Sequence, residues 1–226
     1  SVIIVAMLIA ISLLLAWAIS VAMTFLNYYD FTVVEENNRL IITRGLLEKK
    51  RVTIPLQRVQ AIKIVENPFR QILGLAAVVV ESAGGGFSGE ADKKIVLFPL
   101  IKKANAIIAL QQLFPTIDFQ GHIEVKSPKR ARAFFYRIDF IWLIPLIGVL
   151  SYFYFPYGLL SILLVAPMLL LGIWQFRTAG FTIKEQQLTI ISRNFSRITF
   201  IVEKSRIQIA QSKQSYFQKR KQLATA

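Results

Sequence analysis

The sequence predicts an α+β membrane protein in which transmembrane helices alternate with small domains of antiparallel strands. The first observation is composition: 54% of the 226 residues are hydrophobic and the mean hydropathy is +0.51, which is high for a soluble protein. The second is a set of long apolar runs, and the third is a repeated phrase. FTVVEENNRLIITRG at residues 31–45 returns as FTIKEQQLTIISRN at residues 181–194. Each copy of the phrase directly follows an apolar run, so the predicted unit is a membrane helix followed by a β-domain.

The first apolar run, residues 1–26, carries no charged residue. At about 1.5 Å per residue, a helix of this length exceeds the roughly 30 Å thickness of the hydrocarbon layer. A secretory signal peptide is the alternative, but the run lacks a basic start and is too long. The first residue is a serine within the run, so we expect the chain to be part of a longer one. Small residues recur every four positions and predict a face for packing against another helix, with ordinary membrane-helix composition as the alternative: Ser12, Ala16 and Ser20.

Residues 138–176 predict a transmembrane helical hairpin. Two apolar runs, 138–155 and 158–176, are separated by Pro156, Tyr157 and Gly158. Proline and glycine favour a tight turn, and the tyrosines and phenylalanines around it are typical of a membrane interface.

Between the first run and the hairpin, residues 27–122 predict a complete β-domain, the first β-segment. Apolar residues alternate with polar ones, as at Val52 and Ile54, which indicates half-buried strands. The expected strands are residues 29–35, 39–45, 49–54, 59–66, 75–82 and 93–98. A helix between Pro99 and Pro115 has apolar residues on one face and is expected to close the domain. Six to seven antiparallel strands with a carboxyl-terminal helix predict a small β-barrel or sandwich.

Residues 177–226, the second β-segment, predict an incomplete copy of that domain. The alignment pairs Arg44 with Arg193 and Arg58 with Arg206, but nothing corresponds to the later strands or to the closing helix. Apolar strand faces without those elements would be open to water. We therefore expect this segment to be poorly ordered, or to be completed by residues outside the chain.

The run IPLQRVQAIKIVENPFRQILGLAAVVVESAGG, from Ile54 to Gly85, resembles the core of the bacterial pleckstrin-homology (PH) domain family. The alternation of such domains with pairs of membrane helices is similar to that of multi-repeat membrane proteins of this family. The resemblance implies a PH-like barrel, a membrane location, and a sister membrane protein or a second copy as partner. One departure concerns ligands, because the first hairpin, VVEENNRLII, is acidic where phosphoinositide-binding domains are basic. Phosphoinositide recognition at that hairpin is therefore not expected.

Basic residues gather in the linker 123–137 and just after the hairpin. They are Lys126, Lys129, Arg130, Arg132, Arg137 and Arg177. By the positive-inside rule they predict a multi-pass protein of the bacterial cell membrane with both β-segments in the cytoplasm. Binding of anionic lipid is the alternative role for the same charges.

The sequence offers no catalytic set, so we expect no enzymatic activity, cofactor, metal site or small-molecule substrate. Cysteine is absent, and the single histidine, His122, lies in a polar connector. The glycine-rich stretch 83–93 lacks the ending of a phosphate-binding loop. Lys49, Lys50 and Arg51 in the second hairpin, and Phe87 in the glycine-rich stretch, are candidate contacts for an anion or a partner. Nucleic acid is not expected, because membrane-proximal placement accounts for the net charge of +14.

The function that these observations favour is a scaffold, in which PH-like domains bind one another or a partner at the membrane. Two alternatives stay open. One is a component of an envelope-protection or export system, and the other is a sensor of anionic lipid.

Overall fold

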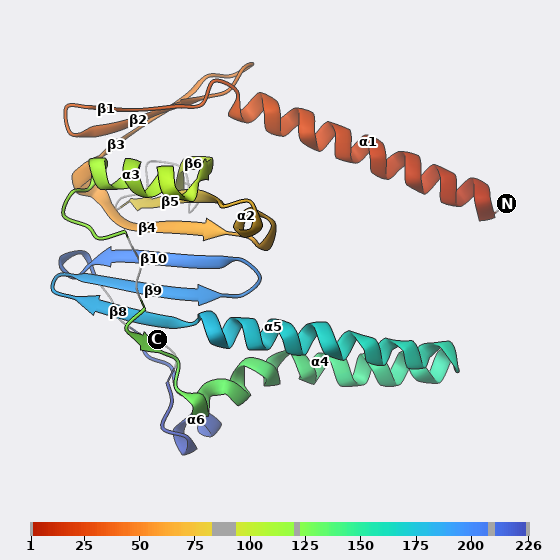
Figure 1. The fold of residues 1–226 in the computed structure, drawn as a ribbon. Coiled ribbons are helices and arrows are strands. Elements are labelled where there is room, and N and C mark those ends of the chain that lie inside the picture. Colours follow the sequence, from red (N-terminus) through yellow and green to blue (C-terminus); the bar gives the residue numbers. More distant parts are fainter. Residues whose placement is uncertain (1, 83–93, 120–122, 208–210, 225–226) are drawn as a thin grey trace.

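The computed structural model describes residues 2–82, 94–119, 123–207 and 211–224. Its helices and strands form an α+β structure with two sheets at one end and three apolar helical segments projecting from them (Figure 1). Phe87 and His122 lie outside the described residues, so the prediction for Phe87 remains a prediction.

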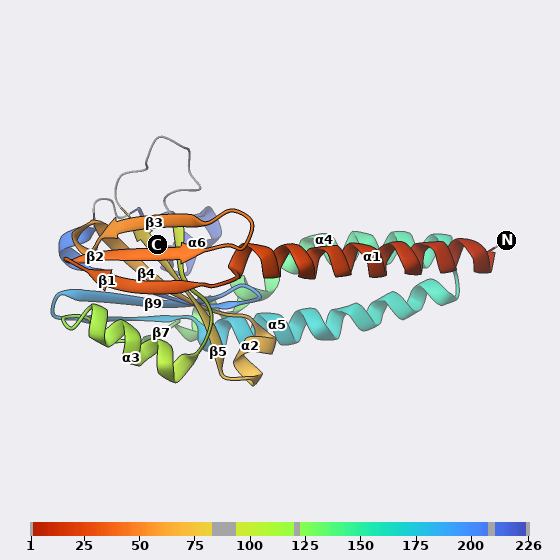
Figure 2. The same cartoon turned by 90° about the horizontal axis from the view of Figure 1, so that it is seen from above.

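The helical part consists of α1 (Val2–Tyr28), α4 (Arg132–Phe153) and α5 (Val165–Thr178), which project in the same direction (Figures 1 and 2). Among the described residues, Ile3–Tyr28 and Tyr157–Thr178 are long and apolar enough to cross a membrane, and Leu143–Phe153 is a shorter apolar stretch.

The predicted helical hairpin turns where its proline and glycine were expected to place the turn. α4 ends at Phe153, and the chain continues as η4 (Tyr157–Leu164), a 3-10 helix that leads directly into α5. The Gly158 N–H donates to the Tyr154 carbonyl at 2.7 Å. A Cβ at position 158 would lie 2.0 Å from the Leu150 carbonyl oxygen, so only glycine fits here.

The first sheet is an antiparallel meander of β1 (Thr32–Glu36), β2 (Arg39–Arg44) and β3 (Lys50–Pro55). Asn37 and Asn38 connect β1 and β2 with positive φ angles of 51° and 62°. Asparagine tolerates this conformation, and two such residues make a tight hairpin turn that matches the strand twist. After β3 the chain enters a one-turn 3-10 helix, η1 (Leu56–Arg58).

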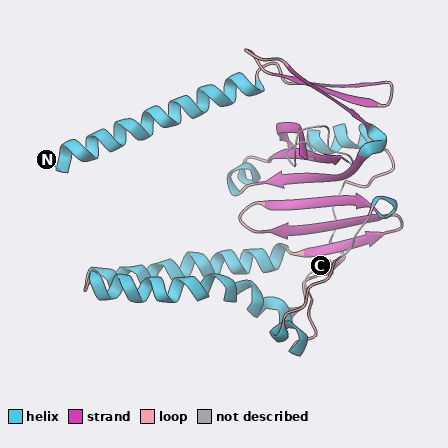
Figure 3. Ribbon diagram, turned by 180° about the vertical axis from the view of Figure 1, so that it is seen from behind, coloured by secondary structure: helices cyan, strands magenta, loops and turns pink. Residues whose placement is uncertain are grey.

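The second sheet has seven antiparallel strands in the order β6-β5-β4-β10-β9-β8-β7 (Figure 3). From the first β-segment come β4 (Val59–Glu66), β5 (Leu75–Ser82) and β6 (Lys94–Lys102). From the linker and the second β-segment come β7 (Val125–Lys126), β8 (Gly180–Lys184), β9 (Gln187–Arg193) and β10 (Arg197–Glu203). The chain ends in η5 (Lys204–Arg206) and α6 (Tyr216–Arg220).

The central pairing of this sheet joins the two β-segments. β10 runs antiparallel to β4, with Ile201 opposite Ile62 and Arg197 opposite Glu66. The structure therefore corrects two expectations. The described strands form two open sheets instead of a closed barrel, because the free edge of β4 pairs with β10. The second β-segment, expected to be poorly ordered or completed from outside the chain, forms three paired strands, and β4 of the same chain pairs with β10. Among its described residues, no element corresponds to β5, β6 or α3.

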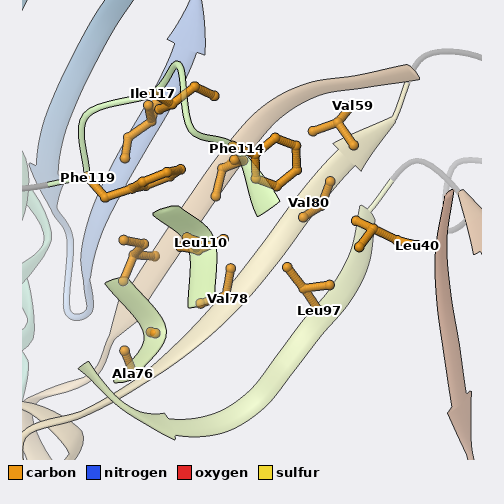
Figure 4. Packing of buried hydrophobic residues seen from close by; sticks show 14 of the residues in the cluster. Leu40, Val59, Ala76, Val78, Val80, Leu97, Leu110, Phe114, Ile117 and Phe119 are labelled. Carbon is orange, nitrogen blue, oxygen red and sulfur yellow. The ribbon is translucent and has the colours of Figure 1, made fainter. Parts of the chain in front are cut away.

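The main core lies under α3 (Lys103–Leu113), which packs on the sheet through Ala106 and Leu110 (Figure 4). The helix was expected between Pro99 and Pro115, but β6 extends through Lys102 and α3 begins at Lys103. The largest fully buried residues of this core come from β2, β4, β5, β6, α3 and β10: Leu40, Ile62, Val78, Val80, Leu97, Leu110 and Ile201. Because Ile201 belongs to the same cluster, the two β-segments share one hydrophobic core.

Candidate functional site

The junction between β4 and β10 is the candidate functional site. At one of its ends, the Arg206 side chain binds both strands' neighbouring segments through hydrogen bonds. Arg206, in η5, reaches back across the chain to η1 and the start of β4. Its Nη1 donates to the carbonyl oxygens of Leu56 and Gln57, each at 3.4 Å, and to the Val59 carbonyl. Its Nε donates to Glu203 at 2.6 Å, which holds the guanidinium in place. A charged donor on backbone carbonyls is a strong contact, so η5 is fixed to the first β-segment.

The other end of the junction holds a buried carboxylate. Glu66, the last residue of β4, is only 3% exposed. Lys103 Nζ donates to its two oxygens at 3.0 and 3.1 Å, and Arg197 Nε lies 3.8 Å from Oε2. The three residues come from β4, α3 and β10. A buried carboxylate needs such cations, because an unpaired buried charge is strongly destabilising.

Arg193 connects this junction to the apolar helix α5. Its guanidinium lies 3.7 Å from the centroid of the Trp174 ring, its Nε donates to Thr178 at 3.1 Å, and its Nη2 donates to Gln71 at 2.8 Å. Burial lowers the pKa of Arg193 below the ordinary arginine value; Arg197 lowers it further, and Glu66 opposes the shift. The residue therefore ties α5, the end of β9 and α2 (Pro68–Ile72) together.

A similar attachment joins α1 to the first sheet. The N–H groups of Gly45 and Leu46 donate to the carbonyls of Tyr29 and Leu26, each at 2.9 Å. Gly45 has a φ of +105°, a conformation that glycine adopts without strain. The Arg44 guanidinium lies 5.4 Å from the centroid of the Tyr28 ring. Arg44 aligns with Arg193 in the repeated phrase, so in both segments an arginine at the end of the second strand contacts an aromatic ring of the preceding helix.

The predicted basic residues lie where α4 and α5 leave the sheet. Lys126 is in β7, Lys129 and Arg130 are in η3 (Lys129–Ala131), Arg132 and Arg137 are in the first two turns of α4, and Arg177 is in the last turn of α5. Arg130 Nη1 donates to Gln222 at 3.3 Å. The structure thus places the set near the root of the helical hairpin, and the side of the membrane on which it lies remains a prediction.

The three basic residues of the second hairpin lie at or just before the start of β3, and their contact with an anion or a partner remains a prediction. Lys49 and Lys50 are exposed, and Lys50 Nζ lies 3.7 Å from Glu48. Lys50 and Arg51 are neighbours in β3, so their side chains point to opposite faces. With Arg44 and Glu48, Lys50 lines a cavity of about 450 Å³ at the root of α1.

The predicted packing face of α1 meets no neighbour among the residues that the structure describes. Ser12, Ala16 and Ser20 are exposed. The Ser12 hydroxyl donates to the Ile9 carbonyl of its own helix at 2.8 Å. Packing of this face against another helix therefore remains a prediction.

Sequence reasoning did not single out the three residues that hold the junction, Glu66, Arg193 and Arg206. The signal for both arginines was their position in the aligned copies, which pairs them with Arg44 and Arg58. The sequence held no signal for Glu66, because an acidic residue at the end of a strand is ordinarily exposed to water. Among the described residues, no group of three or more histidine, cysteine, aspartate or glutamate side chains could hold a metal ion.

Comparison with known proteins gives two matches. The model of the bacterial PH domain family matches residues 1–113 and 140–226. The UPF0699 transmembrane protein YdbT of Bacillus subtilis (strain 168) is 37% identical over 221 residues, which cover 97% of this chain and 45% of that protein. The chain thus spans less than half the length of this relative, and no solved structure matches it. A family match over most of the chain, together with this relative, shows that the chain belongs to the bacterial PH domain family as a membrane-associated member.

Proposed function

We propose that this protein is a non-enzymatic assembly scaffold of the bacterial cell membrane, in which bacterial PH domains join edge to edge through their strands. The observation that carries the proposal is the β4–β10 pairing. It joins two stretches that each match the family model, and it does so by backbone pairing, a shared core and the Arg206 contacts. Such β-augmentation is a common way for proteins to bind one another.

The first sheet offers a second edge of the same kind. The elements β1-β2-β3-η1 follow α1 in the same order in which β8-β9-β10-η5 follow α5. The counterpart of β10 is therefore β3. Among the described strands, β3 pairs only with β2, so its outer edge has no neighbouring strand. We infer that this edge binds a β4-type strand of another bacterial PH domain, in a second copy or in a sister membrane protein.

The backbone of β3 indicates which groups would make the contact. The Leu56 N–H donates to the Asn38 carbonyl on the β2 side, and successive N–H groups of a strand alternate in direction. The N–H groups of Arg51 and Thr53 therefore point outward. Pro55 is tolerated at the next outward position because proline needs no partner there.

The proposed orientation puts the scaffold in the cytoplasm with several membrane passes. Its support is the basic set at the root of the hairpin, from Lys126 to Arg132 and at Arg177. Cytoplasmic loops of membrane proteins are enriched in such residues.

The test compares Thr53→Pro with Thr53→Val in the full-length protein. The proline removes an outward donor and leaves the bonds to β2 intact, whereas valine keeps the donor. The measurement is the mass of the purified protein in detergent by native mass spectrometry, together with any membrane protein that co-purifies. We expect the wild type and Thr53→Val to be oligomeric or to retain a sister protein, and Thr53→Pro to lose that partner. A wild type that is strictly monomeric and without partners would overturn the proposal.

A further inference from the structure

Six large apolar side chains are exposed at the end of the sheets from which the membrane helices project. Three belong to α2 and the residue after it, two to the β2–β3 turn and one to the β9–β10 turn. They are Leu46, Leu47, Phe69, Ile72, Leu73 and Phe195, and we call them the apolar rim. Ile72 and Leu47 are 82% and 83% exposed, which is extreme for residues of this kind. A cluster of such residues marks a surface that contacts something other than water.

The α2 part of the rim is held in one orientation. Asn67 caps the helix by accepting from the Arg70 N–H at 2.8 Å, and the Gly74 carbonyl accepts from the Lys103 N–H at 2.9 Å. Gln71 faces the junction, where its side chain binds Arg193. Since Gln71 lies on the inner side, Ile72 and the other apolar residues of α2 are presented outward by a fixed helix.

The two turns of the rim lie beside the ends of membrane helices. Leu46 donates its N–H to the Leu26 carbonyl in α1, and Gln175 in α5 donates through Nε2 to the Asn194 carbonyl at 2.9 Å. At about 1.5 Å per residue, α1 is longer than the roughly 30 Å hydrocarbon layer, so the end of α1 that holds Leu26 reaches the interface. Leu47 and Phe195 are the neighbours of these bonded residues, so they lie beside the helix ends that would meet the lipid headgroups.

Figure 1 places α2 at this same end of the molecule, with α1, α4 and α5 extending beyond it. Cationic side chains accompany the apolar ones: Arg70 within α2, and Lys49 and Lys50 after the β2–β3 turn. Apolar side chains with basic neighbours are the combination by which interfacial segments bind a membrane surface.

We propose that the apolar rim is immersed in the lipid leaflet from which the helices emerge, at the boundary between headgroups and acyl chains. The first β-segment then lies against the membrane through α2 and the two turns, in addition to its attachment by α1. This contact does not depend on the β3 edge, so the scaffold proposal and this one can fail separately.

These 226 residues contain no cysteine, which favours a direct test by depth-dependent quenching. Single variants Ile72→Cys and Phe195→Cys are labelled with an environment-sensitive fluorophore in the full-length protein. Gln112→Cys, on the exposed face of α3, is the matched control. The proteins are reconstituted into phosphatidylcholine–phosphatidylglycerol vesicles with or without lipids brominated in the upper acyl chain.

We expect bromolipid to cause a loss of fluorescence at positions 72 and 195 and none at position 112. Quenching at 72 and 195 no greater than at 112 would overturn the proposal. An emission shift at position 72 without bromolipid quenching would also overturn it, because it would show that protein and not lipid covers the rim.

Discussion

Replacing Ile201 by alanine tests whether the two β-segments form one cooperative structure. Ile201 is 1% exposed in β10 and lies opposite Ile62, which is equally buried in β4. The substitution removes three carbon atoms, at about 0.8 kcal/mol each. The cavity left behind brings the expected loss of folding free energy to about 3 kcal/mol.

The assay is hydrogen exchange of the backbone amides of β4 and β5 in detergent-solubilised protein. If β4 opens together with β10, a loss of about 3 kcal/mol lowers protection in β4 roughly a hundredfold. Ile183→Ala is the matched control, because Ile183 is an exposed residue of β8. Surface substitutions of this kind change stability by less than about 0.5 kcal/mol.

The segments in which exchange becomes faster show whether the two β-segments share one core. We expect faster exchange on both sides of the junction in Ile201→Ala and unchanged exchange in Ile183→Ala. Faster exchange confined to residues 180–203, with β4 and β5 as protected as before, would refute a shared core.

Three further substitutions test the polar contacts of the junction. Glu66→Gln removes the negative charge between Lys103 and Arg197, and we expect a loss of about 2 kcal/mol by thermal unfolding; an unchanged or higher melting temperature would contradict the assigned role. Arg206→Met keeps much of the side-chain volume but removes the donors to the carbonyls. The free energy of protection at the start of β4 should therefore fall by about 1–2 kcal/mol, with a smaller change at the far end of β5. Arg193→Lys keeps the charge but cannot reproduce the stacked, two-sided contact, so we expect a lower melting temperature, and wild-type stability would show that charge alone suffices.

The apolar helices and most strands could be predicted from the sequence, because both depend on local patterns. The charge-free run predicted α1 to within two residues at its carboxyl end, and the expected strands 59–66 and 75–82 coincide with β4 and β5. Pro156 and Gly158 predicted the turn of the hairpin, since each has few backbone options.

The arrangement of the strands could not be predicted, because alternation identifies a strand but not its neighbour. β4 was expected to help close a barrel within its own segment, yet its free edge pairs with a strand about 140 residues later in the chain. The burial of Glu66 could not be predicted for the same reason. Its burial depends on Arg197 and Lys103, which come from elements that no local pattern places beside it.

The most direct test of the account is a disulfide across the junction. Lys63 and Phe200 are opposite each other in the β4–β10 pairing, and Lys63 Nζ lies 5.2 Å from the centroid of the Phe200 ring. The variant Lys63→Cys/Phe200→Cys is oxidised in native membranes, and the tryptic peptides are analysed by mass spectrometry. Lys63→Cys/Ser192→Cys is the control, because Ser192 lies one strand further away, in β9. The account predicts linked peptides for the 63–200 pair and none for the 63–192 pair; no link at 63–200, or equal linkage in both, would contradict it.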